Sequence, residues 1–223
     1  MEDTRERIVS AAAELLAAGG REAVTTRAVG TAAGVQAPTI YRLFGDKRGL
    51  LDAVAEWGFA TYLSGKDFWV ANRDPVENLR AGMDLHVEFG LTHPDLYALM
   101  YGEPRPTPSP AATHARSILA GHIRAIAAAG RLRVSEAHAV HVIHATGCGS
   151  VFALLEQPAD QRDRAAAAIA RDAALAAITT DAPATEAPGP AAAANALRAA
   201  LPDAPELSDA ERALLGEWLD RLS

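Results

Sequence analysis

One stretch of the chain contains the signals that decide its fold, and it reads TTRAVGTAAGVQAPTIYRLFGDKRGLL from residue 25 to residue 51. Thr25 is placed to accept hydrogen bonds from the free amides of a helix over 26–33, and Gly34 supplies the left-handed residue that ends it after two turns. A third helix is predicted over 36–44, because Pro38 is tolerated in a first turn. Two short helices joined by a glycine-containing turn predict a helix-turn-helix unit.

Apolar residues at helical spacing continue on both sides of this unit. A first helix over 4–18 is followed by Gly19 and Gly20, and a long fourth helix begins near Lys47 and runs through Tyr62. Capping boxes predict two further helix starts, at Asp74-Pro75-Val76-Glu77 and at Ser208-Asp209-Ala210-Glu211. Helices are therefore expected over 75–93, 95–101, 111–129, 135–157, 160–179 and 208–222, with a proline-rich loop over 103–110 and a proline-rich linker over 181–190.

The composition also favours helices. Of the 223 residues, 49% are hydrophobic and 5% are aromatic, and alanine supplies much of the apolar fraction. Alanine is the best helix former, whereas strands favour branched and aromatic side chains. A single cysteine, Cys148, excludes an intramolecular disulfide and a zinc site built from cysteines. The acidic start of the chain does not look like a secretory signal, so a cytoplasmic protein is expected.

Together these patterns predict an all-α fold in two parts. A three-helix helix-turn-helix domain is expected over 1–51, and the long fourth helix joins it to an all-helical second domain over 52–180. The segment 181–223 is expected to hold the proline-rich linker and an amphipathic C-terminal helix that packs back on the second domain.

Charge is distributed unevenly along the chain. Between residues 21 and 51 the sequence carries a net charge of +3, whereas the whole chain carries −7, which leaves −10 for the remainder. A polyanion would be attracted to the N-terminal part and repelled by the rest.

A long uncharged helix is the second unusual feature. No Asp, Glu, Lys or Arg occurs from Ala137 to Leu155, which is roughly the length that a bilayer requires. Its histidines and glycines make it too polar for lipid, so a helix buried inside protein or in a subunit interface is expected, with no membrane partner. A ridge of small residues (Ala145, Gly149 and Ala153) would let another helix pack closely. The alternative is an ordinary core helix within one chain.

The N-terminal stretch resembles the DNA-binding domain of TetR-family transcriptional repressors. The most specific matches are Ala33-Gly34-Val35, Thr39-Ile40-Tyr41, Phe44 and Lys47, all in register. The resemblance implies that the second domain binds a small-molecule effector and forms a homodimer through a four-helix interface, here the helices near 135–157 and 160–179. It further implies a repressor that its effector releases from a palindromic operator in double-stranded DNA.

The exposed start of the third helix is expected to read DNA. The Gln36 amide is expected to form hydrogen bonds with an adenine edge in the major groove. The methyl groups of Ala37 and Thr39 are expected to contact a thymine methyl there. Hydroxyl and basic side chains nearby would hold phosphates. The expected DNA contacts are Thr25, Thr26, Arg27, Gln36, Ala37, Pro38, Thr39, Tyr41, Arg42 and Lys47. The alternative is that Tyr41 packs in the core and Arg42 is only solvated.

Apolar and aromatic residues with a few polar tips are the candidates for an effector pocket. They are Trp57, Tyr62, Met83, His86, Phe89, Tyr97, Met100, Tyr101, His141, His144 and Phe152. The histidines are notable because an unpaired imidazole is costly to bury on an otherwise apolar helix. For each residue taken singly, ordinary core packing is the alternative.

Other functions remain as alternatives at this point. His138, His141, His144 and Cys148 have spacings that suggest a metal sensor, although one helix seldom supplies a complete ligand set. An enzyme would have to use Ser150 or Cys148 beside His144, with no turn that exposes a nucleophile. A DNA-binding regulator without an effector is the third alternative. The preferred interpretation includes no catalytic residue, no metal site and no cofactor.

Overall fold

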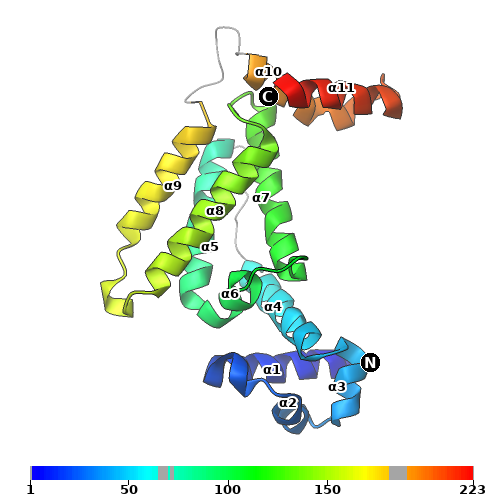
Figure 1. Ribbon diagram of the computed structural model, residues 1–223, viewed down its shortest axis with the longest axis vertical. Helices are drawn as coiled ribbons and strands as arrows, with labels where there is room; N and C mark the ends of the chain where they lie inside the picture. The colour runs from blue at the N-terminus through cyan, green and yellow to red at the C-terminus, as the bar shows by residue number, and fades with distance from the viewer. Residues whose placement is uncertain (1, 65–69, 71–72, 181–189, 223) are drawn as a thin grey trace. The chain divides into compact units, whose positions relative to one another are not determined.

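The computed structural model describes residues 2–64, 70, 73–180 and 190–222, and within them the chain is all-α, with no strand (Figure 1). An isolated bridge between Leu132 and Thr179 accounts for all of the extended pairing in this part of the chain. The α-helices are α1 (Glu2–Ala23), α2 (Thr26–Ala33), α3 (Ala37–Phe44), α4 (Lys47–Leu63), α5 (Pro75–Thr92), α6 (Pro94–Tyr101), α7 (Pro110–Ala128), α8 (Glu136–Leu155), α9 (Arg164–Ile178), α10 (Pro190–Ala200) and α11 (Asp209–Leu222).

The chain forms two compact units, and neither is continuous in sequence. The first consists of residues 1–66 with 89–115, and the second of residues 67–88 with 116–223. Helices α5 and α7 therefore each contribute residues to both units. The expected boundary between 51 and 52 falls inside α4, whose residues all belong to the first unit.

The local signals around α2 act as the sequence predicts. The Oγ1 atom of Thr25 accepts a hydrogen bond from the amide of Ala28 at 3.1 Å, which caps α2. Gly34 ends this helix with φ of 65°, a left-handed conformation that glycine adopts without steric cost. Its amide donates back to the carbonyls of Gly30 and Thr31. The sharp turn that follows directs the chain into α3.

Buried apolar side chains hold the first unit together. Helix α1 packs on α2 and α4, and α4 packs on α3 and α6. The core includes Ile8, Val29, Ile40, Leu50 and Val54, all at most 1% exposed. Rings from α4, α5 and α6 extend this core, with the centroids of Phe59 and Phe89 5.4 Å apart. These contacts hold α2 and α3 in fixed positions against α1 and α4.

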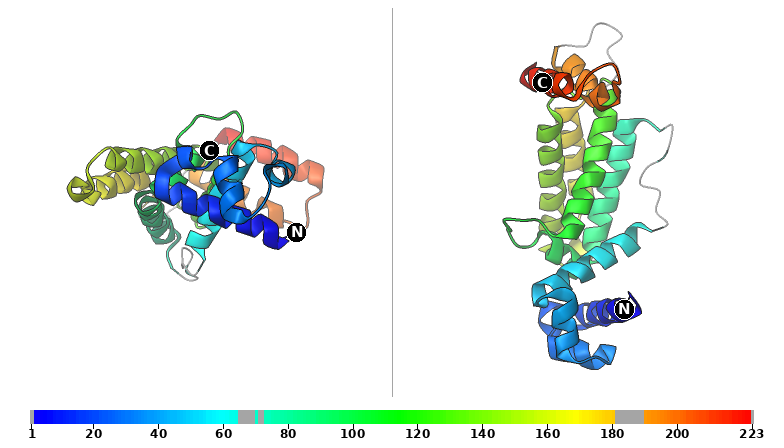
Figure 2. Two further views of the ribbon diagram at one scale, coloured as in Figure 1. Left: turned by 90° about the horizontal axis from the view of Figure 1, so that it is seen from below. Right: turned by 90° about the vertical axis from the view of Figure 1, so that its right-hand side faces the viewer.

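In the second unit, α8 lies alongside α9, as two views show (Figures 1 and 2). The core is formed by residues of α5, α7, α8 and α9, including Leu79, Ile126, Ile143 and Leu175. Helix α10 joins this core through Asn195, whose amide donates to the carbonyls of Leu132 and Val134 at 3.3 and 2.9 Å. Because these are buried polar contacts, they fix the position of α10 on the unit.

One expected helix end was confirmed, and two other expectations were wrong. Gly19 and Gly20 interrupt α1 with non-helical backbone, as predicted for the end of the first helix, and a short helical segment through Ala23 follows them. The helix expected from 160 is divided, because Asp163 caps a new start at Arg164 after a short 3₁₀ turn over Ala159–Gln161. Helix α10 was not predicted at all: of the linker expected over 181–190, residues 181–189 lie outside the described residues, and Pro190 begins α10. The last helix, α11, begins at the predicted capping box, with Ser208 and Glu211 bonded reciprocally.

Helix α8 is, among the described helices, the one that is long and apolar enough to cross a membrane. Only 28% of its most apolar window is buried within the chain. Length and composition alone are weak indications, since core helices of other proteins pass the same criterion. The exposed part of α8 therefore needs a structural explanation.

Candidate nucleic-acid interface

The start of α3 presents its side chains to solvent. Gln36 is the residue before the helix, in an extended conformation, and its side chain forms no cap hydrogen bond. Gln36 and Pro38 are exposed, and Ala37 and Thr39 are half-buried. The amide of Gln36 is thus free to form the paired hydrogen bonds that a base edge requires.

Tyr41 and Arg42 lie one turn further along α3, and both are exposed. The Tyr41 side chain is 51% exposed, which excludes the alternative in which it packs in the core. The buried face of α3 is formed by Ile40 instead. A phenol and a guanidinium side by side on an exposed helix can each donate a hydrogen bond to a phosphate oxygen.

The basic residues of this region are not neutralised by the protein itself. Within the described residues, Arg27, Arg42, Lys47 and Arg48 form no ion pair. Arg21 differs, because its guanidinium pairs with the carboxylate of Glu103 in the same unit. Four cations around α2, α3 and the start of α4 therefore remain available for an anionic partner.

The backbone amides at the start of α4 are partly used by hydrogen bonds within the protein. Asp46 caps this helix, and its Oδ1 accepts a hydrogen bond from the amide of Gly49 at 2.8 Å. One of the amides at the start of α4 is therefore already bonded within the protein and is not available to a phosphate beside Lys47. The Lys47 ammonium itself remains half-exposed and unpaired within the described residues.

Thr25, Thr26 and Arg27 complete the expected set at the start of α2. Thr25 and Arg27 are exposed, and Thr26 is half-buried. The Thr25 hydroxyl accepts the cap hydrogen bond from Ala28, and its own proton stays available to a phosphate. The expected DNA contacts thus all lie on α2, α3, the turn between them and the start of α4.

The expected effector residues are divided between the two units. Trp57, Tyr62, Phe89, Tyr97, Met100 and Tyr101 belong to the first unit, and Met83, His86, His141, His144 and Phe152 belong to the second. Phe89, Tyr97 and Met100 are buried, whereas Trp57 is 44% exposed. Sequence reasoning missed Phe59, His93 and His114, whose rings pack in the same aromatic cluster of the first unit.

Two histidines of the second unit, His86 on α5 and His144 on α8, are close enough to influence each other's charge. Burial and, less strongly, the neighbouring His144 lower the pKa of His86 to about 4. The pKa of His144 is lowered by burial and by Arg116 and His141. Gly147 makes room for this arrangement, since a Cβ atom there would meet the His86 ring at 3.1 Å. The interior between α5 and α8 thus holds neutral imidazoles.

The metal alternative gains nothing from the structure. In the described part of the chain, no three His, Cys, Asp or Glu side chains are grouped so that they would hold a metal ion. The Sγ atom of Cys148 lies 3.8 Å from both ring nitrogens of His144, one helical turn away. His141 is exposed on α8.

Comparisons with known proteins agree with this geometry. Residues 8–54 match the sequence profile of the family described as "Bacterial regulatory proteins, tetR family". The tetracycline repressor protein class C of Escherichia coli is 48% identical over 52 residues, which span 23% of this chain and 24% of that repressor. The curated relative is thus matched over about a quarter of its length.

Solved structures extend the similarity to most of the chain. A TetR variant from Acinetobacter baumannii AYE, in complex with minocycline, is 25% identical with a TM-score of 0.57, covering 76% of this chain and 93% of that one. SmeT, the repressor of the multidrug efflux pump SmeDEF of Stenotrophomonas maltophilia, shares the fold at 21% identity with a TM-score of 0.58, covering 83% and 94%. Residues 8–54 thus form a DNA-binding domain of the tetR family of bacterial regulatory proteins, and most of the chain shares the all-helical fold of these solved regulators.

Proposed function

We propose that this protein is a dimeric transcriptional repressor that a small-molecule effector releases from a near-palindromic operator. The observation that carries the proposal is at the start of α3. There the exposed Gln36 side chain forms no cap hydrogen bond, and the basic side chains near it have no ion-pair partner within the described residues. A helix-turn-helix presents this part of its second helix to the major groove. The DNA-binding protein would act in the cytoplasm, where the operator is.

In the complex, the amide of Gln36 would bind an adenine edge and the methyl groups of Ala37 and Thr39 would contact a thymine methyl. Thr25, Tyr41, Arg42 and Lys47 would bind phosphates, which positions α3 without reading sequence. The rest of the chain carries a net negative charge and would be repelled by DNA. The charge distribution therefore orients the approach.

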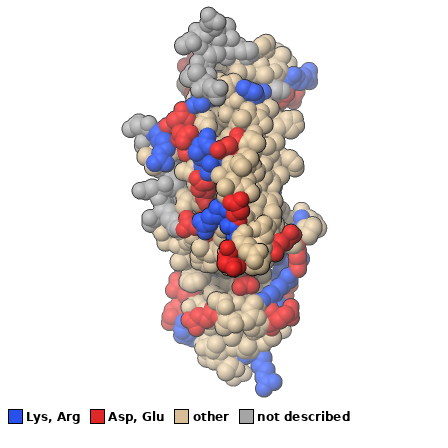
Figure 3. Space-filling model, turned by 90° about the vertical axis from the view of Figure 1, so that its left-hand side faces the viewer, with Lys and Arg blue, Asp and Glu red and all other residues tan. Residues whose placement is uncertain are grey.

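A second copy of the chain would cover the exposed side of α8 and α9. We call this surface the α8–α9 face, and it consists of Ala145, Gly149 and Ala153 of α8 with Ala165, Ala166, Ile169, Ala173, Ala176 and Ala177 of α9, all exposed in one chain. Ile169 is 71% exposed and lies among these exposed alanines, and an exposed apolar patch of this kind is typical of an interaction surface. Seen from the side of α9, much of the second unit's surface carries no charge (Figure 3).

Small residues on this face support close helix packing. Ala145, Gly149 and Ala153 recur every four residues and leave a narrow ridge on α8. Packing of this ridge on its symmetry mate would bury the uncharged helix α8 between two subunits. No membrane is then needed to explain its apolar surface. A two-fold dimer would present two α3 helices to half-sites about 34–36 Å apart or a little more.

The effector part of the proposal rests on the second unit. The minocycline complex shows that a protein with this fold holds a small molecule, and a similar role is proposed for this chain. Binding would change the separation of the two α3 helices in the dimer. A coupling of about 1 to 3 kcal/mol would weaken operator binding 5- to 150-fold.

The test is fluorescence anisotropy with labelled duplexes from the gene's own upstream region, measured across a salt series. Wild type should bind one region more tightly than scrambled duplex, and the affinity should fall steeply with salt. Gln36→Ala should lose about 1–3 kcal/mol of discrimination at one base pair. Lys47→Ala should weaken all duplexes similarly and reduce the salt slope by about one unit.

Arg133→Ala is the matched control, because Arg133 is an exposed arginine of the second unit. It should bind DNA as wild type does. Equal binding to every duplex, or an unchanged Gln36→Ala variant, would contradict the assignment of α3 as the reading helix.

A further inference from the structure

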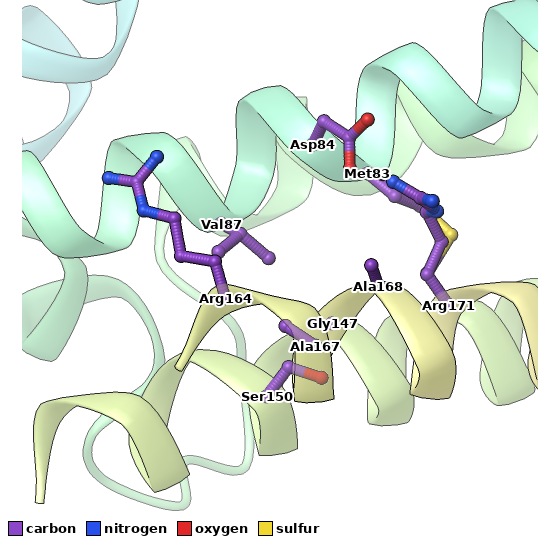
Figure 4. A pocket seen from close by; sticks show the side chains of 9 residues that line it. All are labelled: Met83, Asp84, Val87, Gly147, Ser150, Arg164, Ala167, Ala168 and Arg171. Atoms are coloured by element: carbon purple, nitrogen blue, oxygen red, sulfur yellow. Dashed lines mark hydrogen bonds and ion pairs between the residues drawn. The ribbon is translucent and has the colours of Figure 1, made fainter. Parts of the chain in front are cut away.

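A cavity lies within the second unit between α5, α8 and α9 (Figure 4). Its volume is about 150 Å³, which suits a small molecule rather than a drug-sized one. Of the residues that sequence analysis expected to bind an effector, Met83 alone lines it. The cavity is therefore a site that those candidates did not describe.

The middle of the cavity is apolar. Met83 and Val87 line it from α5, and Ala167 and Ala168 line it from α9. Two successive alanines leave space that longer side chains would fill. An apolar body placed here would be removed from water, which favours binding by roughly 25 cal/mol for each Å² buried.

The two ends of the cavity carry arginines, and these differ in their partners (Figure 4). Arg171 pairs with the carboxylates of Asp84 and Asp172, the latter at 2.9 Å from Nε. These hydrogen bonds raise the pKa of Arg171, the one from Asp172 most strongly. The guanidinium of Arg171 is thus already satisfied, and Asp84 adds a negative charge at that end.

Arg164 has no such partner. Within the described residues it forms no ion pair and no side-chain hydrogen bond. Ser150 of α8 also lines the cavity, and a hydroxyl can donate a hydrogen bond to an anion. Because the Arg171 charge is offset by Asp84, the uncompensated positive charge of the lining is at Arg164.

We propose that this cavity binds a small monocarboxylate, with its carboxylate on Arg164 and Ser150 and its apolar body between α5 and α9. A dicarboxylate would place its second charge near Asp84 and should bind more weakly. The binding site does not depend on DNA recognition, but its role as the effector site rests on the proposed function. A ligand here would link α9, which carries part of the α8–α9 face, to α5.

Isothermal titration calorimetry on the full chain tests the proposal with straight-chain carboxylates from propanoate to hexanoate. Pentanamide and pentanedioate serve as the uncharged and dianionic comparisons for pentanoate. We expect saturable binding of at least one monocarboxylate, and at least about tenfold weaker binding of pentanamide, because a hydrogen bond to a charged group is lost. Equal binding of pentanoate and pentanamide, or binding of no carboxylate, would overturn the proposal.

Three variants locate the site. Arg164→Gln should weaken monocarboxylate binding at least about tenfold, and Ala168→Leu should abolish it by filling the cavity. Arg133→Gln removes an exposed arginine elsewhere in the second unit and should leave affinity unchanged. Circular dichroism melting confirms that each variant folds. Wild-type affinity in both Arg164→Gln and Ala168→Leu would place the ligand elsewhere and overturn the assignment.

Anisotropy with the upstream duplex separates this inference from the proposed function. Carboxylate binding that is lost in Ala168→Leu establishes the site even if no duplex binds. Specific duplex binding without any carboxylate binding leaves the regulator and removes this cavity as its ligand site.

Discussion

The helix-turn-helix and the α8–α9 face are both exposed surfaces, but they are specified in opposite ways. Around α2 and α3, individual residues have individual roles. Thr25 caps a helix, Gly34 makes a turn, and the Gln36 side chain forms no cap hydrogen bond and so stays available to a base. The α8–α9 face is formed by alanines, a glycine and Ile169, and what its members share is small size or apolar character rather than individual hydrogen-bonding roles. The first surface suits recognition of a defined chemical pattern, and the second suits close packing against a copy of itself.

The largest expected effect comes from a charge placed on the α8–α9 face. Ala145→Glu would bring two carboxylates together across the two-fold axis, and like charges in an interface cost several kcal/mol. The dimer dissociation constant should rise at least about 100-fold, measured by sedimentation equilibrium. Ala193→Glu, on an exposed position of α10, is the control and should leave the dimer intact. A fully dimeric Ala145→Glu protein would show that the subunits meet elsewhere.

Acid should affect the second unit and spare the helix-turn-helix, since the first histidine of the chain is His86. The pKa of His86 is lowered from 6.5 to about 4 in the folded protein, so the unfolded chain takes up protons first as the pH falls. Stability is therefore lost as pH falls from 6.5 towards 4, with about 2 kcal/mol lost by pH 5. Urea unfolding at pH 7 and pH 5 measures this loss.

His86→Gln is the companion variant for the pH experiment, because it removes the buried titrating group. Its stability should change less between pH 7 and pH 5 than that of wild type. His122 and His144, whose pKa values burial also lowers, would account for the dependence that remains. An unchanged pH dependence in His86→Gln would show that its imidazole is solvated at neutral pH.

The smallest expected effect is at the cap of α2. Thr25→Ala removes the hydrogen bond to the amide of Ala28 and should lower the free energy of unfolding of the first unit by about 1 kcal/mol. Thr31→Ala is the matched control: the Thr31 hydroxyl bonds back to the carbonyl of Arg27 inside the helix and caps nothing. Thermal melting of both variants distinguishes the cap from a general effect of losing a threonine.

The sequence predicts the elements that local chemistry determines. The bounds of α2 and the starts of α4, α5 and α11 follow from caps that the structure contains, at Thr25, Asp46, Asp74 and Ser208. Helix α10 gave no such signal, because Leu197 is its one large aliphatic residue and a single residue makes no apolar stripe at helical spacing. What holds it is Asn195, which bonds carbonyls more than sixty positions away along the chain. A contact at that separation leaves no trace in the local pattern.

The candidate sites show the same limit. The DNA contacts could be proposed because they lie within one short segment whose spacing is a known motif. The cavity between α5, α8 and α9 could not, since it depends on the absence of side chains at Ala167 and Ala168 and on which arginine happens to have a partner. Ion pairing between distant residues, such as Arg171 with Asp84, is decided only by the packed structure.

Because the first unit is discontinuous in sequence, it limits which segments of the chain can be joined to another protein in a chimera. A fragment that ends after α4 lacks Phe89 and Tyr97, which are buried in the same unit as α1 to α4. The ion pair of Asp52 with Arg105, at 2.7 Å, would also be cut. A chimera that grafts residues 1–66 onto another effector domain would therefore expose an aromatic core. A stable chimera would have to include residues 89–115 together with residues 1–66, or use a second domain that has matching residues on the equivalent helices.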